Sequence, residues 1–134
     1  MSKELKFDNG DEAVINIASF SNSLSLKNAI SKSLLAQGVK LANIDINNVD
    51  SLLDAILAAD SDEAVNKAIF TCLAKSTYNK EKITFDIFED EKARENYYEI
   101  VIECLKINLS PFLKPLISKL KAFFQNRVEN QKLK

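Results

Sequence analysis

A chain of 134 residues, 46% hydrophobic and 28% charged, has the size and composition of one globular domain and not of a disordered segment or a two-domain protein. Only two glycines and two prolines occur, which argues against a many-stranded sandwich or barrel and favours long helices with short connections. The formal net charge of −1 gives the chain as a whole no strong preference for an acidic or a basic partner.

The first 17 residues predict a β-hairpin. In the run LKFDNGDEAVINI, apolar residues alternate on both sides of Asn9-Gly10, a strong signal for a hairpin turn. Two registers are open, because a two-residue Asn9-Gly10 loop sets Phe7 opposite Glu12, whereas a loop over residues 8–12 does not. The longer loop gives the pairs Phe7 with Ala13 and Leu5 with Ile15. We favour the longer loop.

Helical spacing begins after the hairpin. Over residues 21–37 apolar residues recur every four positions, and Gly38 follows as a left-handed stop. The apolar positions are Leu26, Ile30 and Leu34. A second, shorter helix is predicted over residues 49–59.

A third helix is predicted to open at Asp60, which forms a capping box with Glu63. It should end near Ser76, and residues 78–81 then read as a polar turn. Phe70 falls off the apolar stripe of this helix.

A fourth helix is predicted over residues 91–109. Its apolar residues cover an arc of about 220°, which requires cover on several sides and predicts that Ile100, Val101 and Cys104 are buried at the centre of the bundle. Carboxylates gather just before this helix and in its first turn, where they cap amides and do not form a catalytic pair. These acids are Asp86, Glu89, Asp90 and Glu91.

Ser110-Pro111 predicts the start of a fifth helix, since serine caps amides and proline has no amide to leave unpaired at the first helical position. Its apolar face is about 140° wide, more than the roughly 100° that docking on its own core requires. We expect Leu113, Ile117 and Phe124 to face outward from that stripe.

The expected fold is therefore mainly α, a compact bundle of about five helices with a short N-terminal β-hairpin. Residues 1–134 form one domain, with the hairpin at 1–17, helices within 21–126 and a frayed polar tail at 127–134. Strands are expected only within about residues 3–17.

The residues for common chemistry are missing from the sequence. It contains no histidine, and Gly10 and Gly38 stand alone, so histidine-dependent catalysis and glycine-rich phosphate loops are excluded. Cys72 and Cys104 lie among apolar neighbours and read as buried thiols. We expect no enzyme activity, no cofactor and no metal site.

No segment has signal-peptide or membrane-spanning length, so we expect a cytoplasmic protein without a membrane partner.

Charge is unevenly distributed along the chain. Residues 111–134 hold six cations against Glu129 alone, a net charge of +5 that leaves −6 for the rest. Such a segment suits nucleic acid or an acidic protein surface, but cations at a helix C-terminus also complement its dipole. We adopt the second interpretation and do not expect nucleic acid as a partner.

Surplus apolar surface is where a partner would bind. The candidate partner-binding residues are Leu113, Ile117, Phe124, Phe70 and Tyr98, the last in a pair with Tyr97. Side chains of this kind also serve as core in a small bundle.

Three stretches carry a resemblance to a known family: INIASFSNSLSLKNAI (residues 15–30), YNKEKITFDIFEDEKARENYYEIV (78–101) and INLSPFLKPL (107–116). Together they resemble the small tail assembly chaperones of long-tailed bacteriophages. One departure is Phe85, which stands after Thr84 where the family pattern has proline. The departure weakens Thr84 as a helix cap.

The resemblance implies a helical, non-catalytic protein in the host cytoplasm. It would coat the aggregation-prone tape measure protein until tail tube subunits replace it, and some members are also made in a longer, frameshifted form. Alternatives stay open: a structural phage protein retained in the virion, such as a head-tail connector or tail tube component, or a small nucleic-acid-binding adaptor. A homo-oligomer is also open.

Overall fold

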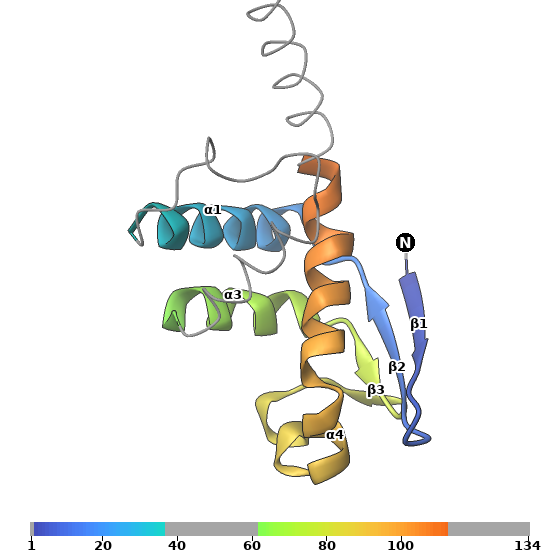
Figure 1. Ribbon diagram of the computed structural model, residues 1–134. Coiled ribbons are helices and arrows are strands. Elements are labelled where there is room, and N and C mark those ends of the chain that lie inside the picture. The colour runs from blue at the N-terminus through green and yellow to red at the C-terminus, as the bar shows by residue number, and fades with distance from the viewer. Residues whose placement is uncertain (1, 37–61, 113–134) are drawn as a thin grey trace, which may run out of the picture.

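The computed structural model describes residues 2–36 and 62–112 (Figure 1). The first part contains strands β1 (Ser2–Lys6) and β2 (Glu12–Asn16) and helix α1 (Phe20–Ala36). The second part contains helix α3 (Glu63–Leu73), strands β3 (Thr77–Tyr78) and β4 (Glu81–Lys82), the 3₁₀ helix η3 (Phe85–Glu89) and helix α4 (Glu91–Glu95). Residues 97–112 are also helical, and we call them the central helix.

The four strands form one antiparallel sheet in the order β1-β2-β3-β4. The expected mainly α bundle of about five helices is therefore wrong, and so is the restriction of strands to residues 3–17: the described residues combine helices with a sheet. β3 and β4 have two residues each, too few for a period-two pattern. Asn79 and Lys80 connect them, both at positive φ (49° and 70°) as in a type I′ turn. The turn lacks the glycine that usually marks a type I′ hairpin. For this reason residues 78–81 were predicted to be a polar turn, without the two strands that flank it.

The β1–β2 hairpin has neither of the two registers considered. Leu5 pairs with Ala13 and Lys6 with Glu12, two residues away from the favoured register. Gly10, at φ 91°, donates its amide to the Phe7 carbonyl at 3.0 Å and so closes a short turn. A shift by two keeps every side chain on its face, so Phe7 and Leu5 are buried as the pattern required.

Helices α1 and α3 pack side by side (Figure 1). The first predicted helix is confirmed as α1, with Leu26, Ile30 and Leu34 buried. The third is confirmed as α3, but its cap is Asp62, whose carboxylate accepts a hydrogen bond from the Ala64 amide at 2.9 Å. Asp60, Gly38 and the predicted helix over residues 49–59 lie outside the described residues.

The predicted fourth helix is divided at Asn96, where α4 ends with φ −99° and ψ 1°. Beyond this residue the central helix runs through Ser110 and Pro111 to residue 112, so the predicted helix start at Ser110-Pro111 is wrong. Burial of Asn108 and Leu109 fixes the preceding turn in the core. Tertiary packing there outweighs the local cap and proline signals.

The core surrounds the central helix as its wide apolar arc predicted. Ile100, Val101, Cys104 and Leu105 are each 0% exposed. In Figure 1 this helix runs between the α1–α3 pair and the strands, which explains why several of its sides are buried. The prediction that Ile100, Val101 and Cys104 are buried is confirmed.

A buried side-chain amide joins the central helix to α1 and to the segment that precedes α1. Asn108 Oδ1 accepts hydrogen bonds from the Ala18 amide at 2.9 Å and the Ser23 hydroxyl at 2.8 Å. Its Nδ2 donates to the Cys104 carbonyl at 2.8 Å. Each polar group of this buried side chain is thus paired, as burial requires.

A second polar group joins the hairpin turn to the helix break. The Tyr78 hydroxyl donates to Asp11 Oδ2 at 2.5 Å, and Asn96 Nδ2 donates to the Tyr78 oxygen at 3.0 Å and to Asn9 Oδ1 at 3.2 Å. The pKa of the Tyr78 hydroxyl is raised to about 12, mainly because the side chain is buried and to a lesser extent because the hydroxyl donates to Asp11. The same bond lowers the pKa of the Asp11 carboxyl from its usual 3.8.

Truncating Ile100 should show that the central helix is packed core. We expect Ile100→Ala to lower the free energy of unfolding by about 2 to 5 kcal/mol, measured by denaturant titration, because it leaves a cavity. Leu35→Ala is the matched control: Leu35 is 73% exposed, so its loss should change stability by less than about 0.5 kcal/mol. Equal effects for both variants would contradict the packing described here.

Removing the Tyr78 hydroxyl should raise the pKa of the Asp11 carboxyl toward 3.8, because the bond that favours the carboxylate is lost. In the unchanged protein the contribution of this bond is fully present above pH 3.8 and is lost as pH falls through the lower folded-state pKa. Tyr78→Phe should abolish that acid-side loss. An NMR titration of the Asp11 carboxyl carbon measures the shift, with Tyr98→Phe as control, and an unchanged Asp11 pKa would count against the hydrogen bond.

Candidate functional site

Five aromatic side chains gather where α3, η3 and the start of the central helix meet, and we call them the aromatic cluster. The Phe70 ring centroid lies 4.7 Å from that of Phe85 and 5.9 Å from that of Phe88. Phe88 meets Tyr97 edge to face at 5.1 Å, and Tyr97 meets Tyr98 at 5.2 Å. These separations are typical of attractive aromatic pairs.

Local sequence explains how η3 presents its rings. A 3₁₀ helix has three residues per turn, so Phe85 and Phe88 lie on the same side of η3. Thr84 precedes η3 without a side-chain capping bond, as the departure at Phe85 suggested. Asp90 then caps α4, because its Oδ2 accepts a hydrogen bond from the Ala93 amide at 3.3 Å. This bond supports the capping role that the sequence analysis gave to the acids before the fourth predicted helix.

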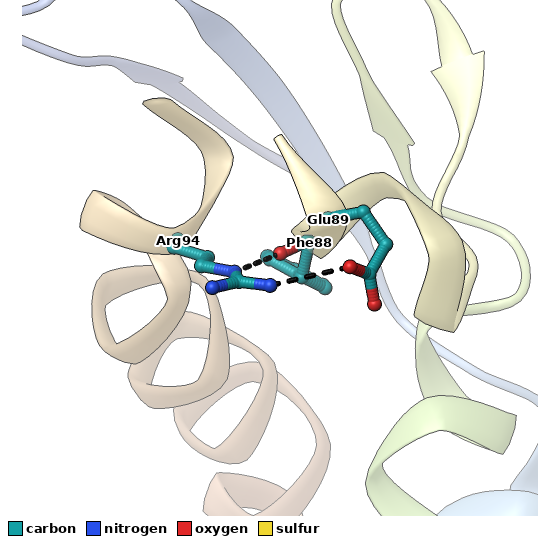
Figure 2. Close-up of polar contacts among 3 residues, drawn as sticks. All are labelled: Phe88, Glu89 and Arg94. Atoms are coloured by element: carbon teal, nitrogen blue, oxygen red, sulfur yellow. Dashed lines mark hydrogen bonds and ion pairs between the residues drawn. The ribbon is translucent and has the colours of Figure 1, made fainter. Parts of the chain in front are cut away.

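Arg94 fixes η3 against α4 (Figure 2). Its Nε donates to the Phe88 carbonyl at 2.6 Å, and its Nη2 lies 3.2 Å from Glu89 Oε2. The side chains of Arg94 and Glu89 are 63% and 78% exposed, so the ion pair itself adds little stability. Its effect is positional, because the two bonds hold the backbone that carries the Phe88 ring.

An open, mostly apolar groove follows the cluster. One part, of about 340 Å³, is lined by Phe70, Phe85, Phe88, Glu89, Arg94 and Tyr97. An adjoining part of about 520 Å³ shares Phe70 and Phe85 and extends along α3 past Glu63, Asn66, Lys67 and Thr71. We call the two parts together the aromatic groove. Phe85 on its wall is 66% exposed, a large apolar surface left to solvent.

The structure places two of the five sequence-predicted binding residues in the aromatic cluster. Phe70 is half-buried at its middle, and Tyr98 is 58% exposed at its edge. Leu113, Ile117 and Phe124 lie outside the described residues.

Sequence reasoning missed Phe85 and Phe88 as site residues. Their spacing of three was a usable signal, but it required recognising residues 85–89 as a 3₁₀ turn.

Within the described residues no group of three or more Cys, Asp or Glu side chains is placed to hold a metal ion. Cys72 and Cys104 are free and buried, and burial raises the pKa of the Cys72 thiol to about 11. Among the helices of residues 2–36 and 62–112, none combines the length and apolar character of a membrane span. What the aromatic groove offers a ligand is mainly apolar surface, including the rings of Phe70, Phe85 and Phe88.

Removing Arg94 should loosen η3 without unfolding the protein. For Arg94→Ala we expect a loss of less than about 1 kcal/mol in the free energy of unfolding. The Ile87 and Asp90 amides, whose bonds of 3.3 Å hold η3, should exchange faster with solvent in NMR experiments, and the Ile100 amide should not. Lys106→Ala removes a 4.0 Å pair with Glu103 and should leave all three unchanged. Equal exchange in both variants would deny Arg94 this role.

Comparison with protein families gives a match over most of the chain. The family described as phage tail assembly chaperone protein, TAC, matches residues 12–124, which include the aromatic cluster and all strands except β1. No curated protein and no solved structure matches the chain. Because the match covers well over half of the sequence, the chain belongs to the phage tail assembly chaperone family.

Proposed function

We propose that this chaperone binds the tape measure protein of a long-tailed phage and keeps it soluble while the tail is built. Membership of the family gives the process, phage tail assembly, and indicates a role without catalysis. The tape measure protein as client, and the aromatic groove as its binding site, are our proposal.

The single observation that carries the proposal is the exposed aromatic groove. A long helical client with apolar faces is covered when its side chains enter such a groove, as amphipathic helices do in other complexes. Clustered aromatic rings provide the largest contributions in interfaces of this kind. Phe70, Phe85, Phe88 and Tyr97 line the groove, so the client would contact rings and aliphatic chains rather than a polar surface.

Rigidity also favours this site. The rings contact one another, and Arg94 holds η3, so little side-chain entropy remains to be lost when a client binds. Four large apolar side chains are exposed within the described residues. Phe85 lines the groove, and Tyr98 contacts Tyr97 beside it without lining either part. Phe20 and Leu35 are both on α1 and also line neither part.

A double variant tests the proposal. Phe85→Ser with Tyr98→Ser removes two exposed rings from the aromatic cluster, so the fold should persist while the soluble fraction of a co-expressed tape measure protein falls severalfold. Phe20→Ser with Leu35→Ser is the matched control, since these side chains are 71% and 73% exposed. The measurement is the amount of tape measure protein in the soluble fraction, with circular dichroism to verify folding.

Full protection by the folded Phe85/Tyr98 variant would show that neither the Phe85 ring in the groove nor the Tyr98 ring beside it binds the client. Recovery of the chain in purified virions would instead favour a structural tail component. Steeply salt-dependent affinity for DNA would favour a nucleic-acid adaptor.

A further inference from the structure

The charged side chains that line the aromatic groove balance, with Glu63 and Glu89 against Lys67 and Arg94. The segment that forms one border of the groove, by contrast, is acidic. Residues 85–99, which provide the Phe85, Phe88 and Tyr97 rings, contain six carboxylates against Lys92 and Arg94, a net charge of −4. All six acids are exposed. The groove therefore favours an occupant that is both apolar and basic.

The chain itself contains a segment with these two properties. Residues 113–134 have a net charge of +5. Their apolar side chains include Leu113, Leu116, Ile117, Leu120, Phe123 and Phe124. Residues 37–61 are also apolar but have a net charge of −3, so like charge disfavours them at the same surface.

The distances permit the contact within one chain. The segment starts after Phe112, whose ring lies 6.0 Å from that of Phe20, at the end of the central helix opposite Tyr97. At 1.5 Å per residue this helix separates residue 112 from Tyr97 by about 22 Å. Phe123 and Phe124 come eleven and twelve residues after Phe112, a reach of about 17 Å in a helix and up to about 40 Å in an extended chain. The required span falls between these limits.

From these observations we infer that residues 113–134 cover the aromatic groove of the same chain when no client is bound. Covalent connection favours the chain's own segment over a second copy, since a short tether gives an effective concentration in the millimolar range. The basic side chains meet the acids of residues 85–99, and the phenylalanines shield the aromatic rings from water. The inference concerns the free chain and does not depend on which client is bound.

If residues 113–134 cover the groove, then Leu113, Ile117 and Phe124 have a different role from the partner binding expected from sequence. They would compete with the client for the groove and would not contact it directly. A client must then displace the segment, which lowers its apparent affinity but keeps the free chaperone from self-association through exposed rings.

Zero-length carbodiimide cross-linking of the full chain tests the inference, because it joins a lysine to a carboxylate only where the two touch. An equal mixture of ¹⁴N- and ¹⁵N-labelled chains, without any tape measure protein, is cross-linked and digested for mass spectrometry. We expect links from Lys119 or Lys121 to Asp86, Glu89 or Glu91 within single-isotope chains. Phe85→Ser should lower their yield about tenfold, which corresponds to about 1.4 kcal/mol, whereas the matched control Leu35→Ser should not.

Three results would overturn the inference: mixed-isotope links, which indicate a second copy in the groove; no links to residues 85–99; or equal yields in Phe85→Ser and Leu35→Ser, which indicate contact by charge alone. Since no client is present, none of these results bears on tape measure binding.

Discussion

The structure depends on burying a helix that is apolar on most of its circumference. Ile100, Val101, Cys104 and Leu105 are completely covered, and no single neighbouring layer could cover all of them. The α1–α3 pair provides one side and the sheet the other (Figure 1). This requirement explains why the described residues combine long helices with four short strands. It also explains why the buried faces of β1 and β2 contribute Leu5, Ala13 and Ile15 to the same core.

Two buried asparagines set the position of that helix along its axis. Asn108 fastens one end to the start of α1, and Asn96 fastens the other to the β1–β2 turn and Tyr78. Apolar packing alone tolerates small shifts, whereas a buried amide with paired oxygen and nitrogen atoms permits one alignment. The alignment matters for the site because Tyr97 directly follows Asn96. The hydrogen bonds of the Asn96 side chain therefore also help to place the Tyr97 ring, which lines the aromatic groove.

Long periodic patterns were predictable, and short or composite features were not. The stripe of α1 and the arc around Ile100 span several turns, so their positions followed from sequence alone. β3 and β4 have too few residues for any period, and their turn uses Lys80 at positive φ. Ser110-Pro111 was wrongly predicted to start a helix. The burial of Asn108 and Leu109 keeps the central helix continuous there and outweighs the local cap and proline signals. Two members of the aromatic cluster, Phe70 and Tyr98, were named from sequence as surplus apolar residues, and their role in binding stays a prediction. Phe85 and Phe88 required knowledge that residues 85–89 form a 3₁₀ helix whose rings meet Phe70 on α3.

The edges of the sheet have a consequence for contacts with other chains. In the described residues β1 and β4 form the two edges, where unpaired backbone groups invite further strands. β1 carries exposed Lys3 and Lys6, and β4 is only two residues long. The lysines on β1 and the short length of β4 discourage the addition of another strand. Neither edge is therefore a good template for cross-β growth. A misfolded neighbouring chain would therefore find little sheet backbone to extend at either of these two edges.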